Sequence, residues 1–186
     1  LFNASNAYLY ALNYARERVQ GRDLADALNP EAESVTIIKH PDIRRMLMWM
    51  KTHMEGMRSF IHYIANLFDQ QVLAESEEEK NNLEDYIGLL TPVIKSYCTD
   101  RGFEATVLAM QVYGGYGYTR DYPVERLMRD SKINSIYEGT NGIQAMDLLA
   151  RKLGMKKGGI FLNFLGEMQK TIAAAKESGQ LAELAA

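Results

Sequence analysis

Apolar residues recur at three- and four-residue intervals along most of the chain, the periodicity of amphipathic α-helices. A stripe of small residues, Ala4, Ala7, Ala11 and Ala15, predicts a first helix over residues 1–19 that packs close to a neighbour. A long helix is predicted to begin at Pro41, because proline is favoured in the first helical turn. Its apolar stripe continues for roughly seven turns. The stripe consists of Ile43, Leu47, Met50, Met54, Met57, Ile61, Ile64 and Phe68.

Residues 21–39 lack this periodicity and are predicted to form a loop. Helical spacing returns at Leu83 and continues to Val112, where two glycines end it. Thr91-Pro92 falls inside this segment, and because proline cannot donate a backbone hydrogen bond we expect a kink or a restart there. Two shorter helices are predicted after Tyr122-Pro123 and from Asn141 to Gly154, and an amphipathic stretch covers residues 160–185.

No segment shows sustained two-residue alternation of apolar and polar positions, so no sheet is expected. The predicted fold class is all-α: an antiparallel four-helix-type bundle with an additional C-terminal helical tail. We expect residues 1–154 to form the bundle domain and residues 155–186 to form the helical tail, as the start of a further C-terminal region.

Composition narrows the class of protein. The chain has 186 residues, of which 47% are hydrophobic, and a net charge of −3. These values are typical of a soluble globular domain, and the acidic balance argues against nucleic-acid binding by bulk charge. No apolar run is long enough for a membrane span. The single cysteine, Cys98, fits a reducing compartment, and we expect a cytoplasmic protein. Because the chain starts at Leu1 without an initiator methionine, we also expect a piece of a longer protein.

The common catalytic and metal-binding patterns are missing from the sequence. His40, His53 and His62 lack metal-site spacing, so no metal site is predicted and structural roles are favoured. Cys98 has no CxxC partner and is interpreted as a small core residue. The Gly115-Tyr116-Gly117 segment has Arg120 at the third glycine position of a dinucleotide loop and follows a helix, so a Rossmann site is excluded.

Two local features are candidates for function. The first, QVYGGYGY at residues 111–118, is a helix end that passes into a glycine-rich loop, where a backbone could approach a ligand closely. The second, IYEGTN at residues 136–141, places Glu138 between an aromatic residue and a glycine just before a predicted helix. Taken alone, the first is explained by a helix cap with a tight turn, and the second by a loop glutamate near a helix dipole.

Together these features carry a resemblance to a known family. The block QVYGGYGYTRDYPVERLMRDSKINSIYEGTNGIQ at residues 111–144 resembles the C-terminal helical domain of the flavin-dependent acyl-CoA dehydrogenases. The segment YARER at residues 14–18 resembles the end of that domain's first helix. The resemblance covers about residues 1–153, and the tail resembles the longer subgroup that includes 3-methylmercaptopropionyl-CoA dehydrogenase.

The resemblance implies α,β-dehydrogenation of an acyl-CoA, with electrons passed to FAD and then to an electron-transfer flavoprotein. Glu138 matches the family's catalytic base, and desolvation by its apolar neighbours and by a bound acyl chain would make a carboxylate a stronger base. The Glu138 backbone N–H would stabilise the thioester oxygen, and Tyr137 and Gly139 would shape the acyl pocket. The cofactor contacts implied by the resemblance are Arg18, Gln111, Gly114, Gly115 and Thr140.

The sequence departs from the family pattern in two places. Val19-Gln20 replaces the usual aromatic-glycine pair after the first-helix arginine, and Gly142 replaces a second flavin-contacting polar residue. Family enzymes also contain an N-terminal helical domain and a middle β-domain, so the chain by itself is expected to be inactive. A homodimer or homotetramer is expected for the intact protein.

Two other functions stay open at this point. One is an acyl-CoA dehydrogenase relative with a nucleic-acid-linked alkylation-response role, for which the only basic cluster is Arg151, Lys152, Lys156 and Lys157. The other is a non-catalytic helical oligomerisation domain, which predicts assembly without flavin.

Overall fold

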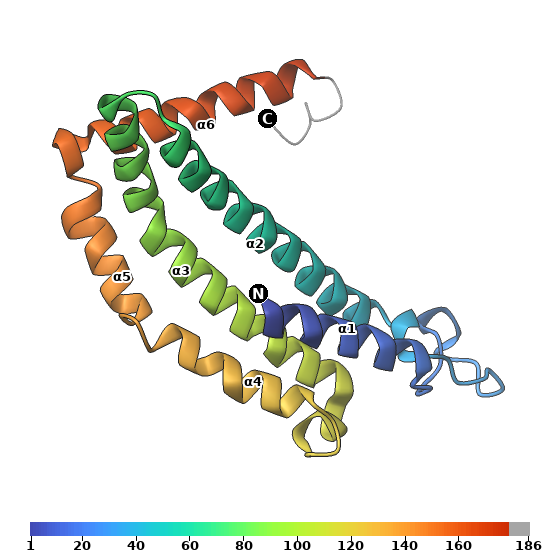
Figure 1. The fold of residues 1–186 in the computed structure, drawn as a ribbon. Coiled ribbons are helices and arrows are strands. Elements are labelled where there is room, and N and C mark those ends of the chain that lie inside the picture. Colours follow the sequence, from blue (N-terminus) through green and yellow to red (C-terminus); the bar gives the residue numbers. More distant parts are fainter. Residues whose placement is uncertain (179–186) are drawn as a thin grey trace. The chain divides into compact units, whose positions relative to one another are not determined.

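The computed structural model describes residues 1–178 (Figure 1). Within that range the chain is helical, and its only extended pairing is an isolated bridge between Val19 and Thr36. The all-α prediction is confirmed. The α-helices are α1 (Phe2–Glu17), α2 (Pro41–Leu73), α3 (Glu77–Tyr113), α4 (Val124–Lys132), α5 (Asn141–Asp147) and α6 (Gly159–Glu177).

The chain divides into two compact units. Unit 1 contains residues 1–62 and 94–140, and unit 2 contains residues 63–93 and 141–186, of which residues 179–186 lie outside the described range. The division passes through α2 and α3, so each unit contains part of both helices.

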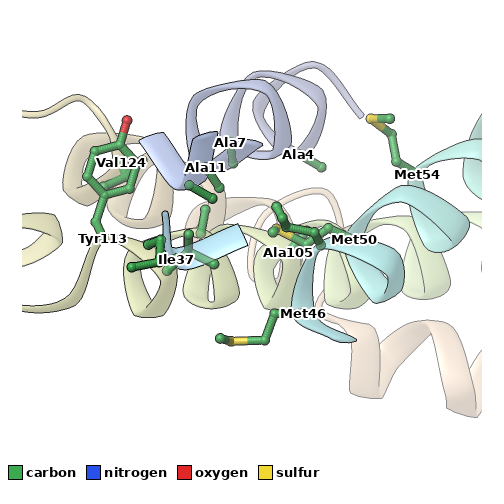
Figure 2. Packing of buried hydrophobic residues seen from close by; sticks show 14 of the residues in the cluster. Ala4, Ala7, Ala11, Ile37, Met46, Met50, Met54, Ala105, Tyr113 and Val124 are labelled. Carbon is green, nitrogen blue, oxygen red and sulfur yellow. The ribbon is translucent and has the colours of Figure 1, made fainter. Parts of the chain in front are cut away.

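The core of unit 1 is built around the alanine stripe of α1 (Figure 2). All four alanines are buried, which lets α1 approach its neighbours closely. Methionines of α2 fill the space beside them, and Ala105 and Ala109 of α3 keep that helix close as well. The core residues are Ala4, Ala7, Ala11, Ala15, Ile37, Met46, Leu47, Met50, Met54, Met57, Ala105, Ala109, Val112, Tyr113 and Val124.

The predicted stripe of α2 is buried through most of its length but is wrong at its last position. Phe68 is 51% exposed, whereas Leu67 is 6% exposed. This part of α2 belongs to unit 2, where Tyr63 and Leu67 face residues of α3 and α6. In this part of α2, different positions are therefore buried, because the helix packs against other residues there.

Of the kink or restart predicted at Pro92, the restart does not occur, because α3 continues through this proline. The Thr91 hydroxyl donates to the Ile87 carbonyl at 2.8 Å and supplies a local hydrogen bond beside the missing proline N–H. The residue four positions before Pro92 is Gly88, which has no side chain to add to the crowding on that turn.

Local hydrogen bonding also alters the C-terminal helices. The predicted helix from Asn141 to Gly154 becomes π-helical over Leu148–Lys152, and the Leu153 N–H donates to the Leu148 carbonyl five residues back. The last helix begins at Gly159 and ends at Glu177. The remainder of the predicted stretch, residues 179–185, lies outside the described residues.

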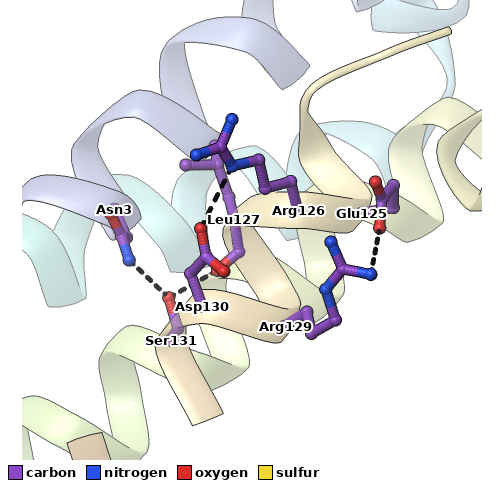
Figure 3. Close-up of polar contacts among 7 residues, drawn as sticks. All are labelled: Asn3, Glu125, Arg126, Leu127, Arg129, Asp130 and Ser131. Carbon is purple, nitrogen blue, oxygen red and sulfur yellow. Dashed lines mark hydrogen bonds and ion pairs between the residues drawn. The ribbon is translucent and has the colours of Figure 1, made fainter. Parts of the chain in front are cut away.

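Helix α4 is held against α1 by a partly buried polar contact (Figure 3). The Asn3 amide donates to the Ser131 hydroxyl at 3.2 Å, and that hydroxyl donates to the Leu127 carbonyl at 2.7 Å. On the exposed side, Arg126 pairs with Asp130 at 3.3 Å. Because α4 leads directly into residues 133–140, this contact fixes where that loop begins.

We predict that Ala7→Leu destabilises the chain, because the Ala7 side chain is fully buried and a larger side chain would force α1 away from its neighbours. Overpacking of this kind costs about 1–3 kcal/mol. Urea unfolding followed by circular dichroism measures the change. Asn13→Leu places the same side chain on the exposed side of α1 and is the control. An equal midpoint for both variants would contradict the prediction.

Candidate active site

A pocket of about 720 Å³ lies in unit 1 where the end of α1 meets the end of α3. Its wall combines backbone from a glycine-rich turn with aromatic and basic side chains. The lining residues are Tyr14, Arg18, Gln20, Gly21, Ile37, His40, Ile43, Gln111, Val112, Tyr113, Gly114, Gly115, Tyr116 and Thr119.

The backbone around Arg18 is fixed on both sides. The Arg18 N–H donates to the Tyr14 carbonyl at 2.8 Å, and its own carbonyl accepts from Ile37 N–H at 2.8 Å. His40 Nε2 donates to the Gln20 carbonyl at 2.7 Å. The segment that follows α1 is therefore held against residues 35–40, and Arg18 projects from a rigid backbone.

The guanidinium of Arg18 lies over the ring of Tyr116, 5.5 Å from its centroid. This cation–π contact orients the positive group without neutralising it. None of the ion pairs found among residues 1–178 uses Arg18. The pocket thus contains an exposed cation that can meet a phosphate group.

Helix α3 ends at the pocket because Gly114 adopts a left-handed backbone with φ of 62°. A Cβ added at Gly114 or Gly115 would meet nothing within 4 Å, so both positions border open space. A Cβ at Gly117 would lie 2.5 Å from the Met110 carbonyl oxygen, so only glycine fits that close approach. The turn therefore presents bare backbone to the pocket while packing tightly behind it.

Tyrosines form the inner side of the pocket. Tyr14 and Tyr113 stack with centroids 4.0 Å apart, and Tyr122 meets the Tyr113 ring at 5.0 Å. The Tyr113 hydroxyl donates to the Tyr10 carbonyl at 3.2 Å. Burial, with help from the neighbouring tyrosines, raises the pKa of Tyr113 to about 12. The stack ties α1 to α3 beneath Arg18 and Gly114.

The second candidate feature is the loop that follows α4. A 3₁₀ turn over Ile133–Ser135 leads into it, and the Ile136 and Tyr137 N–H groups both donate to the Ile133 carbonyl. Glu138 has a left-handed backbone with φ of 55°, and Gly139 follows with φ of 81°. Left-handed backbone is uncommon for a residue with a side chain. Glu138 itself is exposed within this chain.

The structure brings some predicted site residues together and not others. Arg18, Gln111, Gly114 and Gly115 line the same pocket. The second group, Tyr137, Glu138, Gly139 and Thr140, is consecutive in the loop after α4 and contributes nothing to that lining. Tyr137 is 47% exposed, so the apolar neighbours of Glu138 do not bury it within this chain.

Sequence reasoning missed several residues that shape these sites. The sequence predicts Ile43 only as part of the core stripe and His40 only in a structural role, yet both line the pocket. No sequence pattern points to Lys95, although its Nζ donates to the Gly139 carbonyl at 2.8 Å. Residues 95 and 139 are far apart in sequence, and no local pattern connects them.

The described residues offer neither a metal site nor a membrane-spanning helix. Across residues 1–178, no group of three or more potential ligands could hold a metal ion. Cys98 is half-buried against the core of unit 1, and burial raises the pKa of its thiol. In the same range no helix is long and apolar enough to cross a membrane.

The fold and the glycine turn define an all-helical domain with a candidate ligand pocket at the ends of α1 and α3. Residues 1–153 match the family model for the acyl-CoA dehydrogenase C-terminal domain. The chain therefore belongs to the acyl-CoA dehydrogenase family, as the sequence predicted. Members of this family are flavin-dependent oxidoreductases.

Individual relatives agree with this assignment. The chain is 37% identical over 178 residues to the broad-specificity linear acyl-CoA dehydrogenase FadE5 of Mycobacterium tuberculosis, covering 95% of this chain and 29% of the relative. It is 38% identical over 186 residues to 3-methylmercaptopropionyl-CoA dehydrogenase of Ruegeria pomeroyi, covering 95% of this chain and 31% of the relative. The chain thus spans less than a third of either protein.

A solved structure shows the same arrangement of helices. Butyryl-CoA dehydrogenase from Megasphaera elsdenii superimposes with a TM-score of 0.62 at 28% identity, covering 81% of this chain and 33% of that one. The helical-bundle class is therefore shared with an acyl-CoA dehydrogenase of known structure.

We predict that Tyr113 makes the chain lose stability at high pH. Its pKa is about 12 in the folded chain and about 10 in the unfolded chain, so below pH 10 both forms are protonated. As the pH rises from 10 to 12, the unfolded chain releases this proton first, and the free energy of unfolding falls by about 1–3 kcal/mol. Urea titrations at a series of pH values measure the decline.

Tyr113→Phe removes this ionisation and is the comparison. It should lose stability at pH 8 through the missing hydrogen bond to Tyr10 and then decline less steeply above pH 10. Parallel pH profiles for the two proteins would show that Tyr113 ionises normally.

Proposed function

We propose that the protein is an FAD-dependent acyl-CoA dehydrogenase in which Glu138 removes the α-proton of an acyl-CoA thioester. The observation that carries the proposal is the convergence of Arg18, Gln111, Gly114 and Gly115 on one pocket, since Arg18 is far in sequence from the other three. Family membership supports the same reaction class. The substrate, the cofactor and the partners are proposals for the whole protein.

The residues of the pocket suit a dinucleotide. Arg18 supplies a guanidinium for a pyrophosphate, and such groups bind phosphate oxygens through paired hydrogen bonds. Gly114 and Gly115 leave space where a Cβ would otherwise stand, so their backbone can contact a ligand directly. Gln111 adds an amide at the rim of the pocket. These residues would hold the adenosine and pyrophosphate half of FAD, and Thr140 would contact the flavin.

The proposed chemistry divides between the chain and the cofactor. The Glu138 carboxylate accepts the proton from the α-carbon, and the thioester oxygen takes up the developing negative charge. The Glu138 backbone N–H donates a hydrogen bond to that oxygen. A bound FAD would supply the acceptor for the hydride that leaves the β-carbon, and this loss would complete the double bond. Tyr137 and Gly139 would border the acyl chain.

Water must be excluded from Glu138 for this reaction to be efficient. The side chain is exposed within unit 1, so the exclusion has to come from a bound acyl chain and from surfaces beyond this chain. The pocket and the loop do not share lining residues. We infer that in a homo-oligomer the pocket serves the FAD of one subunit and the loop serves that of another. An electron-transfer flavoprotein would then reoxidise the reduced cofactor.

No observation favours a nucleic-acid-linked role. Two members of the basic cluster are paired, Arg151 with Asp147 at 2.6 Å and Lys156 with Asp85. Pairing removes much of the positive charge that a phosphate backbone would need. The non-catalytic oligomerisation domain is separated from the enzyme by the variants below.

We predict that Glu138→Gln in the full-length protein abolishes flavin reduction while leaving the fold intact. Glutamine keeps the side-chain size but is not a base. The rate should fall by about three orders of magnitude or more, at the upper end for a general base with positioning. Stopped-flow bleaching of the flavin with butyryl-CoA and palmitoyl-CoA measures it. Exchange of substrate α-protons in deuterated water should fall in parallel, because that step needs only the base.

Glu125→Gln is the matched control, since it makes the same change on α4 in a residue that lies opposite Arg129 at 3.9 Å. It should retain flavin reduction. Near-normal bleaching in a folded, flavin-loaded Glu138→Gln protein would remove Glu138 from the catalytic role.

We predict that Arg18→Met weakens FAD binding by about 10- to 100-fold, because a charge-assisted contact with phosphate contributes about 1.5–3 kcal/mol. Fluorescence titration of the apoprotein with FAD measures the dissociation constant. Arg16→Met is the control, because Arg16 is an exposed arginine of α1 that does not line the pocket. Equal affinities for the two variants would show that Arg18 does not meet the cofactor.

A further inference from the structure

We propose that Lys95 is a positioning residue for the base: its ammonium group holds the Gly139 carbonyl so that the Glu138 carboxylate and backbone N–H stay directed at the substrate. The inference rests on the proposed function, since it assigns a role toward Glu138. It is carried by a hydrogen bond of 2.8 Å from Lys95 Nζ to the Gly139 oxygen.

The loop needs such a contact because its backbone is not in a preferred conformation. Glu138 and Gly139 are consecutive left-handed residues. A residue with a side chain costs about 1–2 kcal/mol in this region, and it stays there only when the surroundings hold it. Without restraint, the Glu138 backbone would relax toward negative φ and would redirect its side chain and its N–H.

The side of the loop that precedes Glu138 is already held by local hydrogen bonds. The Tyr137 N–H donates to the Ile133 carbonyl at 3.1 Å, and the Tyr137 hydroxyl donates to Asn134 Oδ1 at 2.8 Å. These bonds join the loop to the turn that ends α4. They fix residue 137, on the side of the loop that precedes Glu138.

Lys95 supplies a restraint on that other side. It lies on α3, within unit 1, and is half-buried. A hydrogen bond from an ammonium to a carbonyl is stronger than one between neutral groups, and partial burial shields it from water. Glu138 is therefore placed between two fixed points, one on the turn after α4 and the other on α3.

A lysine suits this task for geometric reasons. Its flexible stem spans the distance from the helix to the loop, and its compact head carries three donors, one of which reaches the Gly139 oxygen. Methionine has a stem of similar length without a donor. Arginine keeps the positive charge and the donors, so it can replace the contact at some cost in geometry.

The experiment uses the full-length flavin-loaded protein and compares Lys95→Met with Lys95→Arg. We expect Lys95→Met to lower kcat and α-proton exchange with butyryl-CoA by about 10- to 100-fold, the effect of misplacing a catalytic group by about 1 Å. KM should change less than about twofold, because the acyl-CoA contacts stay in place. Lys95→Arg should recover most of the loss.

Backbone amide hydrogen exchange gives a readout that does not depend on activity. In Lys95→Met, peptides covering residues 136–141 should exchange faster with and without FAD, while peptides from α1 should not change. Lys51→Met is the matched control, because Lys51 is an exposed lysine of α2 paired with Glu55 at 3.5 Å. It should leave kcat and the exchange of residues 136–141 at wild-type values.

The outcomes separate this inference from the proposed function. If Glu138→Gln retains activity, the proposed function fails. If Glu138→Gln is inactive but Lys95→Met keeps normal kcat and loop protection, the Lys95 inference alone is overturned. A loss that follows only the fraction of folded protein, or a loss that arginine does not restore, overturns it as well. Lys95→Gln, measured in the same way, replaces the methionine variant if that variant does not fold.

Discussion

Close contact between α1 and its neighbours is the constraint on which unit 1 depends. The alanine stripe removes side-chain bulk from one face of α1, so the helix can sit directly against the methionines of α2 and the alanines of α3. Protein interiors are close-packed and contain few voids, so a larger side chain on this face would separate the helices. Both candidate features follow from this contact. The end of α1 delivers Arg18 to the end of α3, and Asn3 near its start holds the helix that leads to Glu138.

The pocket at the ends of α1 and α3 and the loop after α4 expose their candidate functional groups in different ways. At the pocket, glycines expose backbone and leave room, while stacked tyrosines behind them provide stiffness. At the loop, Glu138 has a left-handed backbone, and hydrogen bonds from α3 and from the turn after α4 hold the residues on either side of it. In the proposed function, the first arrangement would bind a large polar cofactor and the second would place one reactive carboxylate. Neither encloses a complete site within this chain, which agrees with the share of its relatives that it spans.

Unit 2 contains an apolar groove that is distinct from the pocket and the loop of unit 1. Parts of α2, α3 and α6 border an apolar groove of about 1020 Å³ there, with Leu67 and Ile160 buried and Glu78, Glu79 and Glu167 around it. The Lys156 ammonium pairs with Asp85 and donates to the Asn82 amide oxygen, which connects the segment before α6 to α3. Nothing in the catalytic proposal depends on this unit. Its packing partners nonetheless explain why the buried face of α2 changes after His62.

The sequence by itself determined the helical class, the start of α2 at Pro41 and the alanine face of α1, because periodicity and first-turn preferences are local properties. It also identified the glycine turn and Glu138 through an ordered motif. The course of α3 through Pro92 and the exposure of Phe68 were decided by tertiary structure, since they depend on which helices lie alongside. The meeting of Arg18 with Gly114, and of Lys95 with Gly139, was decided in the same way. Contacts between residues distant in sequence require the packed core to bring them together, and no local pattern encodes that distance.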